Sequence, residues 1–290
     1  MNNIPFFTTQ IDFLYKIASF RNEWLDWIFL FLNYFDTLYF IMVVIPVVWI
    51  AVSPRWGIRV AILLIFSSLL NTHLKVLFQQ PRPIVDFPNL AMLPFRSPGF
   101  PSGAAQTAAL LGGLLVYGWK SPKAWAIAIP YALLIGFSRL YLGVHYVTDV
   151  LGGYCVGLAI LYAFIYSINS IDTFCKKQGR GFCIVLAILI CLLYAFLVPS
   201  AAGYRLMGAF LGFSAGAYAS IRFRLNPIKS RTVPMRCLSA FITVLIVYIL
   251  YFLTSCARGI PPAIQSFLIA IWISLGAFPF CRAWLKAGNK

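Results

Sequence analysis

The chain has 290 residues, of which 61% are hydrophobic and 10% are charged. This composition excludes an ordinary soluble domain, in which about a quarter of the residues carry a charge, and it indicates an all-α bundle of transmembrane helices. The formal net charge of +16 does not indicate a nucleic-acid partner, because the basic residues lie in short segments between apolar stretches, as a topology signal does.

The first predicted element is an interfacial amphipathic helix within residues 8–35, since Lys16, Arg21, Glu23 and Asp26 interrupt its apolar pattern. A membrane span needs about 20 apolar residues, and nine later stretches reach or approach that length. They are residues 37–53, 58–77, 103–119, 124–140, 147–168, 182–198, 204–221, 237–256 and 263–281. The sequence therefore predicts about nine spans after an N-terminal interfacial helix.

The spans form two predicted parts, residues 1–170 and residues 171–290, joined by a polar, basic connection from Asn169 to Arg180. No acidic residue follows Asp172, so the second part has no carboxylate for acid-base work. We interpret it as an accessory four-span extension for packing, dimerisation or lipid access, and a homo-oligomer is one expected state.

The first motif block runs from Lys75 to Pro83. Lys75 lies near the end of an apolar stretch, and Arg82 lies between Pro81 and Pro83 in the Pro- and Gly-rich segment 78–100, which predicts an irregular rim at the membrane surface. Lys75 alone could equally be a snorkelling interfacial residue. Together with Arg82 and the later Arg139, a shared anion is the better interpretation, because guanidinium groups bind phosphate oxygens bidentately.

The second block is Pro101-Ser102-Gly103-Ala104, at the start of the 103–119 stretch. Its backbone N–H groups would be the unsatisfied donors of a helix N-terminus, which bind anions. Gly103 would permit close approach of a phosphate, and the Ser102 hydroxyl would add a donor. The alternative is an ordinary Ser cap with a glycine turn.

The third block contains Ser138-Arg139, His145 and Asp149. His145 and Asp149 are four residues apart at the start of a span, so the carboxylate can hold one ring nitrogen and leave the other free as a nucleophile. A purely structural His-Asp pair is the alternative. The three blocks together carry three cations and one carboxylate, and this charge balance matches a phosphate dianion.

In order and spacing, these blocks resemble the signature of the type 2 phosphatidic acid phosphatase family, relatives of the vanadium-dependent haloperoxidases. The resemblance covers about residues 75–155 and implies a membrane lipid phosphatase that needs no metal or other cofactor. By this resemblance His145 attacks phosphorus to form a phosphohistidine, and Asp149 orients it. The phosphoryl oxygens would be held by Lys75, Arg82, Ser102, Gly103 and Arg139.

One position departs from the family, which has a His at the place of Ala104 to protonate the leaving oxygen. Three explanations are open: an engineered His-to-Ala change, a natural diphosphate substrate whose leaving phosphate needs no acid, or a lipid-phosphate binder without catalysis. His73 is a poor substitute, because it lies two residues before Lys75 and about 200° around the helix from it.

The basic residues also predict the topology. If the three blocks share one membrane face, most of the other Lys and Arg residues lie on the opposite face, which the positive-inside rule makes cytoplasmic. We therefore expect a multi-pass protein of the cytoplasmic (inner) membrane with its active site facing the periplasm or exterior. Undecaprenyl diphosphate is the leading substrate, with phosphatidic acid or phosphatidylglycerol phosphate next. A lipid phosphotransferase and a non-catalytic binding or transport protein are the rival functions.

Overall fold

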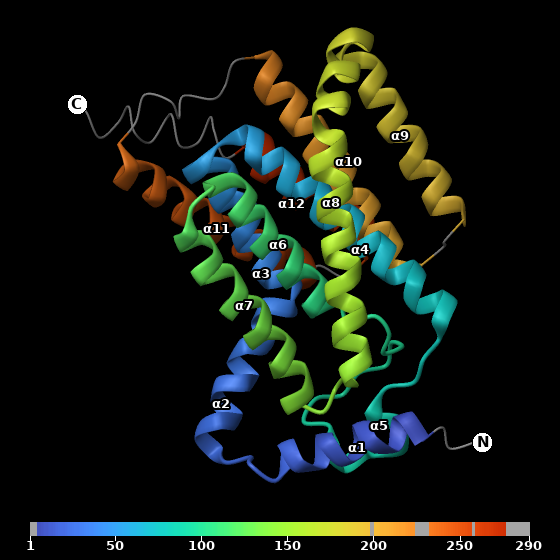
Figure 1. The fold of residues 1–290 in the computed structure, drawn as a ribbon. Helices are drawn as coiled ribbons and strands as arrows, with labels where there is room; N and C mark the ends of the chain where they lie inside the picture. Colours follow the sequence, from blue (N-terminus) through green and yellow to red (C-terminus); the bar gives the residue numbers. More distant parts are fainter. Residues whose placement is uncertain (1–4, 198–199, 224–231, 257–258, 277–290) are drawn as a thin grey trace. The chain divides into compact units, whose positions relative to one another are not determined.

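The computed structural model describes residues 5–197, 200–223, 232–256 and 259–276, and within these ranges every regular element is a helix (Figure 1). This confirms the predicted all-α class. The internal contacts divide the chain into two compact units. One comprises residues 1–40 and 67–167, and the other residues 41–66 and 168–290. All three motif blocks belong to the first unit, whereas the predicted functional division near residue 170 stays a prediction.

The first unit is built around three helices that approach closely: α6 (Gly103–Trp119), α7 (Pro122–Tyr141) and the first two thirds of α8 (Val147–Gln178). Small residues permit this approach, as is usual between membrane helices. A Cβ atom added at Gly112 of α6 would lie 3.3 Å from Ala128 of α7, and one added at Gly153 of α8 would collide with the carbonyl of Ser102. The start of α6 is thus fixed against the first turns of α8.

The N-terminal part of the first unit consists of α1 (Pro5–Ala18), α2 (Glu23–Leu32) and a 3₁₀ turn (Asn33–Asp36). In Figure 1, α1 runs crosswise to α7 and α8, beside the end where α8 begins. Between the end of α4 (Pro54–Phe78) and α6, the chain forms only the short helix α5 (Pro83–Asp86) and a 3₁₀ turn (Pro88–Leu90). The predicted irregular segment after residue 78 is therefore present.

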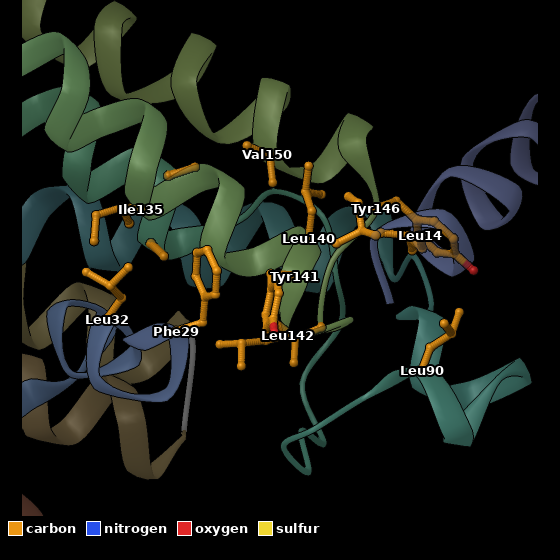
Figure 2. Packing of buried hydrophobic residues seen from close by; sticks show 14 of the residues in the cluster. Leu14, Phe29, Leu32, Leu90, Ile135, Leu140, Tyr141, Leu142, Tyr146 and Val150 are labelled. Carbon is orange, nitrogen blue, oxygen red and sulfur yellow. The ribbon is translucent and has the colours of Figure 1, made fainter. Parts of the chain in front are cut away.

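A buried apolar cluster joins the N-terminal helices to the end of α7 and the start of α8 (Figure 2). Phe29 of α2 stacks on Tyr141 of α7 with ring centroids 4.0 Å apart and an interplanar angle of 25°. Leu14 of α1 and Leu142 are almost completely buried in the same cluster. The cluster includes Leu142 and Val144 of the third motif block, so the N-terminal helices pack directly against that block.

The second unit contains most of α3 (Leu38–Pro46), a π-helical segment (Val47–Val52), the first half of α4, α9 (Arg180–Leu197), α10 (Ala201–Arg222), α11 (Val233–Cys256), α12 (Pro262–Ile271) and a π-helical turn (Trp272–Gly276). Glycines again mark a close contact, since Gly208 and Gly212 of α10 face backbone carbonyls of α12. Near the end of α8, Asp172 pairs with Arg59 at 3.1 Å and with Arg55 at 3.5 Å.

Four helices of the described residues are long and apolar enough to cross a membrane: α4, α7, α8 and α11. A fifth span results if Glu23–Phe35 and Leu38–Val52, which meet at a 60° bend, count as one broken span. The chain is thus a multi-pass protein, but the expected number of nine spans is not confirmed. Residue 198 and residues 277–281 of two expected spans lie outside the described residues.

Two expected boundaries differ from the structure. Residues 8–35 form two helices rather than one, with a break after Ala18. The expected polar, basic connection from Asn169 to Arg180 is helical for most of its length, because α8 continues to Gln178. Polar residues there, including Asp172 and Lys176, end the apolar run without ending the helix.

Candidate active site

The centre of the candidate site is His145, in the short segment between α7 and α8. Its Nδ1 lies 3.1 Å from the Asp149 Oδ2 in the first turn of α8, and its Nε2 lies 3.1 Å from Nη1 of Arg82. A guanidinium group can only donate hydrogen bonds, so Nε2 must accept and Nδ1 must carry the ring proton of the neutral imidazole. This tautomer leaves the lone pair on Nε2, the nitrogen directed away from Asp149.

Burial and charge both favour the neutral imidazole. His145 is 2% exposed, Arg82 is 4% exposed and Asp149 is completely buried. Burial lowers the pKa of His145 well below its ordinary value, and the positive charges of Arg82, Lys75 and Arg139 lower this pKa further. The ring is therefore unprotonated, and so nucleophilic, at neutral pH. The same effect shows that all three predicted cations lie close enough to act on His145 electrostatically.

The first two cations are held by the irregular segment after α5. Arg82 donates from Nε to the Ser97 carbonyl at 2.7 Å and from Nη1 to the Val144 carbonyl at 2.8 Å, and its guanidinium lies 4.4 Å from the centroid of the Phe95 ring. Lys75 donates from Nζ to the Pro98 carbonyl at 2.6 Å. These backbone carbonyls are neutral, so the bonds to them do not reduce the charge of either cation.

The third cation, Arg139, lies in the last turn of α7 and is completely buried. It donates from Nε to the Ser138 hydroxyl at 3.0 Å and from Nη1 to the amide oxygen of Asn33 at 2.8 Å. Ser138 in turn donates to the Ile135 carbonyl at 2.6 Å. Both of these acceptors, the Ser138 hydroxyl and the Asn33 amide oxygen, are neutral.

The second block lies where α6 begins, as predicted. Ser102 is the N-cap residue, and its N–H donates to the Asp149 carbonyl at 2.9 Å. Its hydroxyl does not cap the helix. Although Ser102 is completely buried, this hydroxyl has no hydrogen-bond partner among the described residues. Ala104 is 1% exposed and lies in the apolar cluster, so it brings no polar group to the site.

A buried amide pair supports the second block. Asn71 of α4 donates from Nδ2 to the Pro101 carbonyl at 3.2 Å and to the Gln106 Oε1 at 2.9 Å, while Gln106 donates to the Ser67 hydroxyl at 2.7 Å. A Cβ atom at Gly103 would lie 3.3 Å from the Asn71 Oδ1. The small Gly103 thus makes room for Asn71 in addition to any ligand.

The sequence did not reveal several of these contributors. Gln80 donates from Nε2 to the Asp149 Oδ1 at 2.8 Å, and the Tyr146 N–H donates to Oδ2 at 3.0 Å. Gln80 lies within the first block and could have been suspected from its position, whereas Asn33 and Asn71 have no local signal. His73 is exposed on α4, consistent with the expectation that it does not replace the missing His.

The chain is similar to proteins of one known family. The model of the PAP2 superfamily matches residues 56–173. Phosphatidylglycerophosphatase B of Bacillus subtilis is 38% identical over 111 residues, which are 34% of this chain and 53% of that protein. Undecaprenyl-diphosphatase BcrC of the same organism is 27% identical over 150 residues, 50% of this chain and 76% of that protein.

A solved structure is also similar. The PAP2-type phosphatidylglycerolphosphate phosphatase of Bacillus subtilis, described as transmembrane, aligns with a TM-score of 0.49 and 26% identity, covering 62% of this chain and 90% of that one. The chain spans little more than half the length of several curated relatives that it matches.

Proposed function

Since this chain belongs to the PAP2 superfamily through residues 56–173, we propose that it is an integral membrane phosphatase that hydrolyses a lipid phosphate or diphosphate. The observation that carries the proposal is the buried imidazole of His145. Asp149 fixes its tautomer, and burial together with three cations lowers its pKa, so that Nε2 is unprotonated at neutral pH and accepts a hydrogen bond from Arg82. A purely structural His-Asp pair would not need three cations around it.

In the proposed reaction, Nε2 of His145 attacks phosphorus, a nitrogen–phosphorus bond forms, and the bond to the leaving oxygen breaks. Arg82 donates to Nε2 in this structure, so it must exchange that bond for one to a phosphoryl oxygen before the attack. Asp149 then faces a cationic, phosphorylated ring and stabilises it. Water hydrolyses the phosphohistidine, releasing phosphate and restoring the neutral His145.

The phosphoryl oxygens would meet several donors in this arrangement. Lys75, Arg82 and Arg139 supply charge, and the Ser102 hydroxyl supplies a donor that has no other partner among the described residues. Gly103 begins a helix, whose first N–H groups have no partner within the helix. Donors fixed before the reaction stabilise the charge of the transition state most effectively.

Because Ala104 cannot donate a proton, it indicates which kind of leaving group the substrate has. A general acid contributes about 10²- to 10⁴-fold when the leaving oxygen is strongly basic. An alkoxide is strongly basic, whereas a leaving phosphate has a second pKa of about 6 and needs little protonation. A natural alanine therefore favours a lipid diphosphate. Undecaprenyl diphosphate is our leading candidate, in keeping with the activity named for one relative, and phosphatidylglycerol phosphate, named for another, is next.

We further propose that the site faces the periplasm or exterior of the cytoplasmic membrane. The support is the distribution of basic residues: the end of α8 opposite the His145–Asp149 pair carries Lys176 and Lys177, as cytoplasmic helix ends do.

Radiolabelled substrate tests the proposal directly. Purified protein mixed with undecaprenyl diphosphate labelled in its terminal phosphate, then quenched in alkali, should carry acid-labile label on His145 and release labelled phosphate. His145→Asn should abolish both signals. Turnover without label on protein, or undiminished turnover in the variant, would exclude the phosphohistidine route.

The same samples separate the two rival functions. If label passes to an added lipid alcohol faster than to water, the protein is a phosphotransferase. If a panel of lipid mono- and diphosphates gives binding without any label or product, the protein is a lipid-phosphate binder, as the absence of an acid at Ala104 would then explain.

A further inference from the structure

Gln80 lies at one of the six positions between Lys75 and Arg82 to which the three motif blocks give no role. Its side chain is partly buried, and its Nε2 donates to the Asp149 Oδ1 at 2.8 Å. Since an ionised carboxylate only accepts hydrogen bonds, the nitrogen of the amide must face Asp149. The two residues are 69 apart in the sequence, so this bond links the first motif block to the third.

The end of α4 places Gln80 beside Asp149. Gln79 adopts a left-handed conformation with a φ of 45°, and its N–H donates to the Lys75 carbonyl at 3.0 Å, so the helix ends there. The Gln80 carbonyl then accepts from the Gly99 N–H at 2.7 Å. A Cβ atom at Gly99 would lie 2.9 Å from the Asp149 Oδ2. The backbone bond that anchors Gln80 is therefore formed directly beside the carboxylate.

The carboxylate of Asp149 has donors on both oxygens. Oδ2 accepts from the Tyr146 N–H at 3.0 Å and lies 3.1 Å from Nδ1 of His145, while Gln80 occupies Oδ1. The carboxylate therefore cannot rotate about its Cβ–Cγ bond without losing hydrogen bonds. Donors on a carboxylate also favour its charged form over its protonated form. The amide of Gln80 is neutral, so its bond leaves the charge of Asp149 in place.

We propose that Gln80 is a positioning residue for the His145–Asp149 pair. By occupying Oδ1, it keeps Oδ2 directed at Nδ1 of His145 and keeps Asp149 ionised. This inference rests on the proposed role of His145 as the nucleophile. In that reaction the ring becomes cationic once Nε2 carries phosphorus, and a carboxylate fixed in advance stabilises this charge most effectively. Gln80 thus acts on the reaction through Asp149.

Two substitutions of Gln80 and one of its neighbour test this role. Gln80→Met removes the donor at similar length. Gln80→Asn is the more conservative change, which keeps an amide but is one methylene too short to reach Oδ1. Gln79→Met is the control, because it makes the same change at an exposed side chain. All three proteins keep the cations that act on His145, namely Lys75, Arg82 and Arg139.

We expect both Gln80 variants to hydrolyse undecaprenyl diphosphate about tenfold more slowly than the wild type, the usual effect of losing one hydrogen bond to a charged group. Gln79→Met should match the wild type. The acid limb of the pH–rate profile should move upward in both Gln80 variants, because a carboxylate with fewer donors is protonated at higher pH. In an Asp149→Asn background, Gln80→Met should cause little further loss, because the charge through which Gln80 acts is already absent.

A measurement without substrate separates this inference from the proposed function. The chain has two histidines, so isotope-labelled histidine gives two sets of ring signals in magnetic resonance spectra, and His73→Gln assigns them. In the wild type and in Gln79→Met, the Nδ1 proton of His145 should exchange slowly with water, because it is buried and bonded to Asp149. In Gln80→Met it should exchange about tenfold faster, because Oδ2 is no longer held in place.

Equal turnover in Gln80→Met and Gln79→Met would overturn the inference, as would wild-type turnover in Gln80→Asn. So would a loss that is as large in the Asp149→Asn background as in the wild-type background, because Gln80 would then serve the fold alone. If the wild type has no turnover but the exchange of the His145 proton still depends on Gln80, the proposed function fails and the positioning role remains. If exchange is also unchanged, both fail.

Discussion

The two ends of the candidate site differ in how their polar atoms are paired. At the His145–Asp149 end, both ring nitrogens and both carboxylate oxygens have hydrogen-bond partners. At the start of α6, the buried Ser102 hydroxyl has none among the described residues, and Ala104 beside it is apolar. The proposed nucleophile, His145, is therefore held by hydrogen bonds before any substrate binds, whereas the side proposed to face the leaving group offers a donor but no acid.

The strongest test of this difference supplies the missing acid. Ala104→His should raise the hydrolysis of a lipid monophosphate by about 10²- to 10⁴-fold, and that of a lipid diphosphate far less, because only the alkoxide needs a proton. The measurement is kcat on both substrates. Ala104→Leu, of similar bulk but without a proton, controls for crowding at this buried position. Equal gains with Leu, or a larger gain on the diphosphate, would show that proton transfer is not what the site lacks.

The interaction between Asp149 and His145 can be weakened without removing His145 itself. Asp149→Asn keeps the shape but loses the charge that stabilises the phosphorylated ring, so we expect about 10- to 100-fold slower turnover, with labelled phosphohistidine still detectable. Asp172→Asn, which alters a carboxylate on the same helix that pairs with Arg59, should leave turnover unchanged. Complete loss of the phosphoenzyme in Asp149→Asn would assign Asp149 more than an orienting role.

Removing the Ser102 hydroxyl at the unpaired end should have the smallest effect on turnover among these variants. It should lower turnover and yet stabilise the protein. Ser102→Ala removes one neutral donor, so turnover should fall about 2- to 10-fold, but it also removes an unpaired buried hydroxyl and should raise the free energy of unfolding by about 1 kcal/mol. Ser138→Ala is the contrast, since that hydroxyl has partners and its loss should destabilise the protein. A Ser102→Ala protein that is less stable would mean that the hydroxyl has a structural partner.

How far the sequence predicted this site depends on the kind of residue. The short-range features were predictable: α6 begins at Gly103 as expected, and His145 and Asp149 form a pair because four residues separate them across a helix start. Asn33 and Asn71 were not predictable, because each contacts a residue that is distant in the sequence. A single asparagine forms no sequence pattern that would indicate such a contact. The full extent of α8 was not predicted, because the length of an apolar run indicates only the part of a helix that crosses the membrane.

The length of α8 connects the candidate site to the thickness of the membrane. Its 32 residues extend about 48 Å, well beyond the roughly 30 Å of a bilayer's hydrocarbon core. Its apolar run, residues 147–168, is about 33 Å long, so the polar last turns extend beyond that core. A helix changes its tilt when the thickness of the lipid layer no longer matches its apolar run. Asp149 lies in the first turn of this helix. We therefore expect acyl-chain length to alter catalysis itself, so that vesicles of thin and thick lipids give different rates for the same headgroup.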